Sequence, residues 1–254
     1  MSVAGLNGLA LADSNPLLEA GINSYQKGNY DDAQSNFIQL ITNPRWSFAA
    51  LYNLGNVAAR QKHLGEALAY YERALQKRPH DKDVLFNIKF VEEALGTRRF
   101  AGKLTNYELL RENFLTRFSF SEFLVALFVF SLIFLISLLN FLKRRKVLKT
   151  EESGPVLPTP ASLASGAILI ILTVLTILKI VDSYSERGVV TTAKIDLRSG
   201  PGETNASMQE VQEGTEVVVL DSSGDWKQVT FPSRDFTGWV PTKSLMLTSG
   251  GGPF

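Results

Sequence analysis

The uncharged stretch from residue 123 to residue 142, FLVALFVFSLIFLISLLNFL, constrains the fold more than any other part of the chain. As a helix, this stretch is long enough to cross about 30 Å of hydrocarbon. A core helix of a soluble protein keeps a polar side toward water, whereas here apolar side chains occupy every side of the helix. The stretch therefore predicts a membrane-spanning helix.

A second uncharged stretch runs from Ala161 to Leu178. Lys179 follows it, and a lysine at the end of a span can extend its ammonium group to the membrane surface. Ser162 and Gly166 are four residues apart, a spacing of small residues that lets two membrane helices approach closely. We therefore expect a transmembrane hairpin, with spans over 118–142 and 161–181 and a loop over 143–160.

The charges beside the first span predict the orientation of the hairpin. Basic residues that flank a span tend to stay in the cytoplasm. The residues that we expect to determine the topology follow the first span directly: Lys143, Arg144, Arg145 and Lys146. They place the loop inside and both chain ends outside. Lys103, Arg111 and Arg117 precede the span and weaken this bias, so a cytoplasm-facing arrangement stays open.

The first thirteen residues have two interpretations. Ala10-Leu11-Ala12 before Asp13 has the small-x-small form of a signal-peptide cleavage site, but no Lys or Arg precedes the short apolar segment. Residues 1–13 are either a truncated export signal or a flexible leader. An export signal would agree with the orientation that the basic loop predicts.

Composition excludes several classes of function. The chain has no cysteine, so it has no disulfide framework, thiolate metal site or cysteine nucleophile. A net charge of +1 gives no case for nucleic-acid binding. We interpret His63 and His80 as solvated turn residues. Gly200-Pro201-Gly202 lacks the strand–helix context of a phosphate-binding loop. We therefore expect no enzyme activity, no catalytic residues, no cofactor and no metal.

The region before the first span repeats itself with a period of 34 residues. In residues 48–81, Gly55 and Ala67 are small where two helices must approach, and Tyr71 and Ala74 share a helix face. Pro79 ends the second helix, and Asp81 is placed to cap the next one. Equivalent residues occur one period earlier (Ala20, Gly21, Ala33, Phe37, Leu40) and one period later (Leu85, Ile88).

This pattern resembles the tetratricopeptide repeat (TPR), with two repeats and a closing helix over residues 14–97. The resemblance implies an all-α solenoid whose concave face binds a partner protein. Its groove positions in this chain are Tyr52, Asn53, Asn56, Arg60, Phe86 and Asn87. Their amide and guanidinium groups suit a peptide backbone or a terminal carboxylate. Alternatively, the asparagines are only the common residues of the repeat.

The linker over 98–117 has two interpretations. Tyr107, Leu110, Phe114 and Phe118 recur at intervals of three and four residues. Either this segment is an amphipathic helix at the membrane surface, with Arg111 and Arg117 among the headgroups, or it is the tail of the solenoid.

From Gly188 the chain alternates short β-prone segments with Gly-, Ser- and Asp-rich turns. The segment AKIDLRSGPGETN, followed in order by Glu213-Gly214, Trp226 and Gly238-Trp239, resembles the bacterial SH3 domain. That resemblance covers residues 188–248 and implies an all-β SH3-like barrel, followed by a flexible tail over 249–254. Arg198, Trp226 and Trp239 are its candidate core or ligand-contact residues. Such domains often bind cell-wall peptides, so peptidoglycan is a possible ligand.

Together these parts predict a multi-domain membrane protein. Their order along the chain resembles that of the BatE-type proteins of the aerotolerance (Bat) operon. The resemblance implies a non-enzymatic adaptor in the bacterial inner membrane, with the TPR and SH3 domains on the periplasmic side. It also implies other membrane proteins as partners, including von Willebrand A-domain Bat proteins, and a role in stress tolerance. The alternatives are a cell-wall tether that binds peptidoglycan, and a regulator that faces the cytoplasm.

Overall fold

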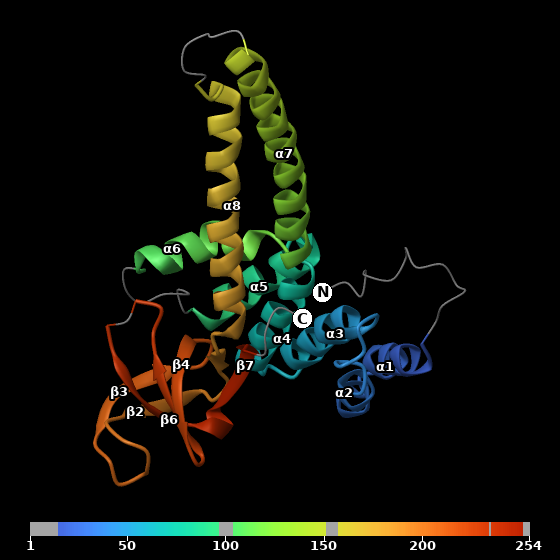
Figure 1. Ribbon diagram of the computed structural model, residues 1–254. Helices are drawn as coiled ribbons and strands as arrows, with labels where there is room; N and C mark the ends of the chain where they lie inside the picture. The colour runs from blue at the N-terminus through green and yellow to red at the C-terminus, as the bar shows by residue number, and fades with distance from the viewer. Residues whose placement is uncertain (1–14, 97–103, 151–156, 234, 251–254) are drawn as a thin grey trace. The chain divides into compact units, whose positions relative to one another are not determined.

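The computed structural model describes residues 15–96, 104–150, 157–233 and 235–250, which form two compact units (Figure 1). The first unit combines the helices that precede Phe118 with the strands that follow Asp182. The second unit comprises residues 118–182. The two parts of the first unit are therefore separated in sequence by the whole of the second.

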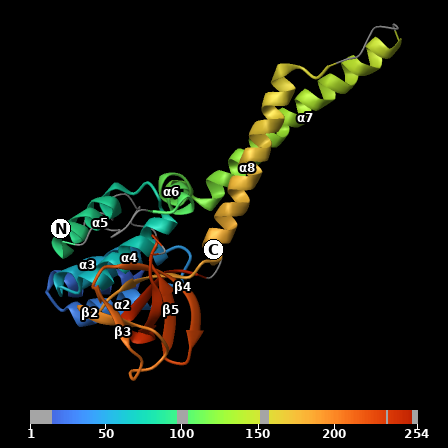
Figure 2. The same cartoon turned by 90° about the vertical axis from the view of Figure 1, so that its left-hand side faces the viewer.

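The first unit begins with five helices: α1 (Pro16–Gln26), α2 (Tyr30–Ile38), α3 (Ser47–Arg60), α4 (Leu64–Lys77) and α5 (Lys82–Leu95). Consecutive helices pack against each other, and Figure 2 shows the ribbon of α5 beside those of α3 and α4. The side chain of Asn15 accepts a hydrogen bond from Leu17 N and caps α1. Asp81 caps α5 in the same way through Val84 N at 3.0 Å, which confirms the predicted cap. Gly96 ends α5 with a φ of 65°.

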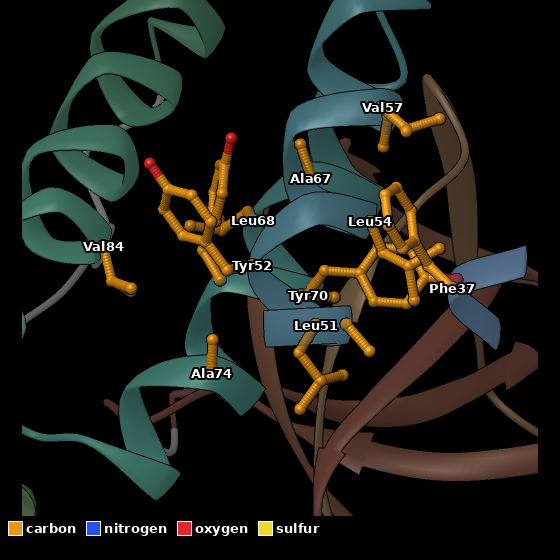
Figure 3. Packing of buried hydrophobic residues seen from close by; sticks show 14 of the residues in the cluster. Phe37, Leu51, Tyr52, Leu54, Val57, Ala67, Leu68, Tyr70, Ala74 and Val84 are labelled. Carbon is orange, nitrogen blue, oxygen red and sulfur yellow. The ribbon is translucent and has the colours of Figure 1, made fainter. Parts of the chain in front are cut away.

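The close approach expected at the small residues is present in both helix pairs. A side chain at Gly55 would collide with the ring of Tyr71, and one at Gly21 would lie 2.5 Å from the ring of Phe37. Tyr71 and Phe37 are fully buried. Figure 3 shows the apolar cluster that these helices enclose, with Leu51, Leu54 and Ala67 among its members.

A short segment completes the helical part of this unit. Helix α6 (Asn106–Asn113) begins at Thr105, whose hydroxyl accepts a hydrogen bond from Glu108 N, and the 3-10 helix η1 (Leu115–Arg117) follows it. Leu115 is fully buried. Of the predicted linker, residues 98–103 lie outside the described residues.

The strands form one antiparallel sheet in the order β3-β2-β6-β5-β4-β1-β7. They are β1 (Arg187–Val190), β2 (Lys194–Arg198), β3 (Ser207–Gln212), β4 (Glu216–Ser223), β5 (Trp226–Thr230), β6 (Thr237–Pro241) and β7 (Leu245–Ser249), with the 3-10 helix η2 (Thr242–Ser244) before β7. The sheet is open: β3 and β7 are its edges, and the pairings do not close the barrel that the sequence predicts. One face of the sheet holds a buried apolar cluster that includes Val190, Leu197, Val229 and Val240.

The sheet packs directly on the helices of the same unit. Val189 of β1 is fully buried within the apolar cluster of the helices, and Met246 of β7 packs against that cluster. Strands β1 and β7 both contact α4. The side-chain amide of Gln76 also donates a hydrogen bond to Thr248 O at 2.9 Å. The helices and the sheet therefore share part of one hydrophobic core.

The second unit contains α7 (Phe120–Thr150) and α8 (Pro160–Tyr184). Ser119 and Glu122 cap α7 reciprocally: Ser119 N donates to the Glu122 carboxylate at 2.6 Å, and Glu122 N donates to the Ser119 hydroxyl at 3.3 Å. A side chain at Gly166 of α8 would lie 3.2 Å from the ring of Phe134, so the two helices approach at this glycine. Within the described chain, residues 120–147 and 160–184 are the helices long and apolar enough to cross a membrane.

The four basic residues were predicted to lie in a loop, but the structure places them in a helix. Helix α7 continues past Leu142 to Thr150, so Lys143, Arg144, Arg145 and Lys146 belong to its last turns. Lysine and arginine have good helix propensity, and an established helix extends at little cost. Pro160, the last residue of the predicted loop, is the first residue of α8, where its fixed φ suits a helix start.

Candidate protein-interaction site

The N-terminus of α4 is capped by a residue of the sheet. His63, at the N-cap position, makes no capping hydrogen bond with its side chain. Instead the carboxylate of Glu213, in the turn before β4, accepts a hydrogen bond from Gly65 N at 2.7 Å. A carboxylate is favoured there because the amide groups and the helix dipole give a helix N-terminus positive character. The repeat region and the sheet are thus joined by a polar contact as well as by their core.

A buried ion cluster also connects α6 to the sheet. Arg187 at the start of β1 donates two hydrogen bonds to the Glu108 carboxylate, from Nη2 at 2.8 Å and from Nη1 at 3.1 Å. Arg111 lies 3.6 Å from Glu216 of β4, and Arg187 lies 3.7 Å from the same carboxylate. Two positive and two negative groups therefore share one buried site.

This cluster corrects the expected position of Arg111. The amphipathic-helix interpretation of residues 98–117 placed Arg111 among lipid headgroups, but its side chain is only 12% exposed and is paired with the carboxylates of Glu108 and Glu216. The alternative interpretation as a solenoid tail is also incomplete, because α6 is attached to strands β1 and β4. Neither interpretation anticipated Arg187.

Four of the six predicted groove residues are buried: Tyr52, Asn53, Asn56 and Asn87. The Asn56 side-chain oxygen accepts hydrogen bonds from the Tyr71 hydroxyl at 2.8 Å and from the Asn87 amide at 3.2 Å. Asn53 donates to Ala49 O in its own helix at 2.9 Å. The expectation that Tyr52 and Asn56 are exposed inner-face residues is therefore wrong. The reason is that the closing helix α5 packs beside α3 and covers them, as Figure 3 shows for Tyr52.

Burial also changes the acidity of two tyrosines in this network. It raises the pKa of the Tyr71 hydroxyl, which donates its proton to Asn56. It likewise raises the pKa of Tyr52. Both hydroxyls are therefore neutral hydrogen-bonding groups at physiological pH, and the two tyrosines serve to pack the helices together.

The other two predicted groove residues are exposed. Arg60 donates a hydrogen bond from Nε to the Tyr25 hydroxyl at 3.2 Å, at the surface between α3 and α1. Phe86 of α5 is 67% exposed. Leu85 and Phe90 of the same helix are 45% and 49% exposed. We use the name α5 stripe for the exposed residues on this side of the helix: Lys82, Leu85, Phe86, Lys89, Phe90 and Glu93.

Helix α5 is thus apolar on two opposite sides. Val84, Ile88 and Val91 are buried against the repeat, while the apolar residues of the α5 stripe face solvent. A helix that is apolar all round is ordinarily buried on both sides. The sequence already carries this signal, because apolar residues occur at 84, 85, 86, 88, 90 and 91. The α5 stripe is therefore the candidate protein-interaction site.

The three candidate residues of the sheet have different surroundings. Arg198 donates hydrogen bonds to the carbonyl oxygens of Glu203 and Asn205 at 2.7 and 2.8 Å, so it holds the turn between β2 and β3. Trp226 and Trp239 are half-buried and lie outside the buried core of the sheet. Trp239 is opposite Gln228 in the register, and the alternation of side chains along β5 places Trp226 on the same face. Of the two roles that the sequence leaves open for them, core or ligand contact, their half-buried positions do not fit the core.

Residues 18–82 match the family model of the tetratricopeptide repeat. That range includes α2, α3 and α4 and most of α1. Residues 18–82 are therefore a TPR region, and TPR regions act in protein–protein interaction. A comparison of the chain with curated proteins gives no match.

Proposed function

We propose that this chain is a non-enzymatic membrane scaffold that binds other proteins. The observation that carries the proposal is that the TPR helices and the sheet form one unit although residues 118–182 separate them in sequence. A chain that leaves this unit in one apolar helix and returns to it in another must cross the bilayer an even number of times. Both apolar helices can then span the membrane while the TPR region and the sheet stay on the same side.

The exposure of the apolar side chains supports this role for α7 and α8. Val125 and Phe128 of α7 are 63% and 64% exposed, and Ile170 of α8 is 67% exposed. A soluble protein gains stability by removing such side chains from water. A hydrocarbon environment removes them equally well. We therefore place the hairpin in the bacterial inner membrane, with the basic end of α7 in the cytoplasm and the TPR–sheet unit on the periplasmic side.

The resemblance to the BatE-type proteins suggests which partners the chain binds. We propose that the sheet is a bacterial SH3 module and that the chain belongs to a Bat-type stress-tolerance complex. Its partners would then be membrane proteins with von Willebrand A domains. The α5 stripe supplies the docking surface, because it presents exposed aromatic residues at the open end of the TPR region.

The test is recovery of partner proteins from gently solubilised membranes with the tagged full chain. The double variant Phe86→Ser, Phe90→Ser should lower recovery at least tenfold. Ile38→Ser is the matched control, since Ile38 is an apolar residue of α2 that is 47% exposed but lies off the stripe. Unchanged recovery in the double variant would remove the stripe as the docking surface. If the native chain recovers no other protein, the scaffold function is refuted.

A second candidate function is a cell-wall tether. It is favoured by Trp226 and Trp239, which are partly exposed on one face of the sheet and so can stack on a ligand. In this function the sheet binds peptidoglycan and the TPR region holds an enzyme. Sedimentation with purified sacculi tests it: the full chain should sediment, and Trp239→Ala should abolish sedimentation while the protein stays folded.

A further inference from the structure

The α5 stripe is the open end of the repeat. Leu85, Phe86 and Phe90 lie 34 residues after Leu51, Tyr52 and Asn56 of α3. In α3 these positions are buried, with exposed fractions of 2%, 7% and 1%. Their counterparts in α5 are exposed because α5 is the last helix of the stack. A terminal repeat helix that remains in water needs a polar outer face, and this one is apolar.

The charges around the stripe specify its occupant. We infer that the α5 stripe binds the α5 stripe of a second copy of this chain, with the two helices antiparallel. A two-fold axis between Asn87 and Ile88 sets Lys82 level with Glu93 of the second copy, and Glu93 level with its Lys82. The same axis sets Leu85 level with Phe90. Opposite charges are thus matched twice by one operation, as an interface between identical copies requires. Leu85 and Phe90 are about 140° apart around the helix, so they flank the contact on opposite edges of the stripe.

Helix geometry places Phe86 at the centre of this interface. With a rise of about 1.5 Å per residue, the Phe86 residues of the two copies lie about 4.5 Å apart along the helix axis. The rotation leaves both residues on the same edge of the interface, so their rings can pack together. Lys89 forms an ion pair with Glu93 of its own helix at 3.8 Å, which draws its ammonium group from the axis toward an acid. The same two-fold axis sets Lys89 of one copy level with Phe86 of the other, so the centre of the stripe combines an aromatic ring with a lysine that is paired with Glu93, and its ends are charged.

This inference rests on the proposed function, which makes the α5 stripe a docking surface, and it names the first occupant of that surface. Membrane anchoring supports it: two copies that are held in one bilayer meet at a higher effective concentration than two free copies. In such a dimer the stripe is occupied, so a partner protein that docks on the stripe competes with the second copy.

Thiol crosslinking of the full chain in detergent tests the register. The natural chain contains no cysteine, so an introduced cysteine is the only thiol in each copy. Differently tagged Lys82→Cys and Glu93→Cys copies are coexpressed and treated with a short bismaleimide. We expect this mixed pair to crosslink at least ten times more than two Lys82→Cys copies or two Glu93→Cys copies, because like positions lie about 16 Å apart along the axis. Lys77→Cys on α4, paired with Glu93→Cys, gives the background yield. Equal yields for all pairs would overturn the register.

Charge reversal provides an independent test by light scattering. Lys82→Glu alone, or Glu93→Lys alone, replaces two attractive pairs of the dimer with two repulsive ones and should raise its dissociation constant at least tenfold. The double reversal restores opposite charges and should bring the constant to within threefold of the natural value. If the double variant is as weak as the single variants, the proposed pairing is wrong.

The outcomes separate this inference from the scaffold function. A natural chain that is monomeric and gives only background crosslinking overturns the dimer, even if Phe86→Ser, Phe90→Ser still reduces the recovery of other proteins. A chain that dimerises in this register but recovers no other protein supports the dimer and refutes the scaffold.

Discussion

Arg187 holds Glu108 through two hydrogen bonds of 2.8 and 3.1 Å, and both side chains are only 2% exposed. The two residues are 79 positions apart in the chain. Glu108 precedes the first apolar helix by twelve residues, and Arg187 follows the second by three. The ion pair therefore fixes together the two chain segments that lead into and out of the apolar hairpin.

Removal of one partner should be costly. Arg187→Ala leaves Glu108 and Glu216 buried with less positive charge nearby, and should lower the free energy of unfolding by about 3–5 kcal/mol. Urea unfolding of the full chain in detergent, followed by tryptophan fluorescence, measures this loss. The paired replacement Arg187→Met with Glu108→Leu is the control, since it removes both charges and should cost less than Arg187→Ala. An equal or larger cost would show that packing, and not uncompensated charge, controls stability here.

The hydrogen bonds that Asn56 accepts should also contribute to stability. Asn56→Ala removes the acceptor of the Tyr71 hydroxyl and of the Asn87 amide, and so leaves two buried donors unsatisfied. We expect a loss of about 2–4 kcal/mol in the free energy of unfolding. Thermal unfolding followed by circular dichroism at the helix band measures it. Asn36→Ala on α2 is the matched control, because its amide bonds Asp32 O at the exposed surface and its loss should cost little. A stable Asn56→Ala protein would contradict the structural role assigned to Asn56.

Tyr71 predicts a loss of stability in alkali. Burial raises the pKa of its hydroxyl in the folded chain, whereas in the unfolded chain tyrosine releases its proton at about pH 10. The contribution of Tyr71 to the stability of the folded chain is therefore fully present below about pH 10. It is lost as the pH rises further, because only the unfolded state then gains free energy by ionisation of this hydroxyl. Unfolding curves between pH 8 and 11 should show this decline. Tyr71→Phe, which cannot ionise, should flatten it, and an unchanged slope would exclude Tyr71 as the cause.

The sequence predicts local structure well where the cause is local. The cap at Asp81 and the close contact at Gly55 depend on residues within one helix pair, and the repeat spacing identifies both. It does not predict the burial of Asn56, because that depends on how α5 packs beside α3. The same period of 34 residues leaves Phe90, at the equivalent position of α5, exposed. A motif gives the position of a residue in its repeat, while neighbouring helices decide its exposure.

The contacts between the TPR helices and the sheet could not be predicted from local patterns. Gly65 and Glu213 are 148 residues apart, and nothing near either residue identifies the other. A weak signal does exist at the helix: no Ser, Thr, Asp or Asn stands immediately before Leu64, so a cap from elsewhere is needed. At the sheet, the sequence left open whether the two tryptophans belong to the core or contact a ligand, and the alternation along β5 and β6 assigns the core to valines.

The position of the tryptophans determines what their removal should do. Trp239 is half-buried, so Trp239→Ala should lower the free energy of unfolding by about 1–2 kcal/mol, below the range of about 3–5 kcal/mol for a buried aromatic residue. Leu197→Ala is the control in the same sheet, because Leu197 is fully buried and should lose about 2–5 kcal/mol. Urea unfolding of the two variants compares them directly. If Trp239→Ala is the more destabilising, its ring contributes more to the fold than its exposure indicates.

The orientation of the hairpin is open to a direct test. Alkaline phosphatase, which is active only outside the cytoplasm, should be active when fused after Thr248 and inactive when fused after Lys149. The reason is that the four cations from Lys143 to Lys146 lie in the last turns of α7 and favour the cytoplasmic side. Replacement of all four with glutamine should produce both orientations and partial activity at each site. Lys103→Gln with Arg117→Gln is the control, and it should leave the pattern unchanged or strengthen it, because these two cations oppose the bias. Activity after Lys149 and none after Thr248 would place the TPR–sheet unit in the cytoplasm.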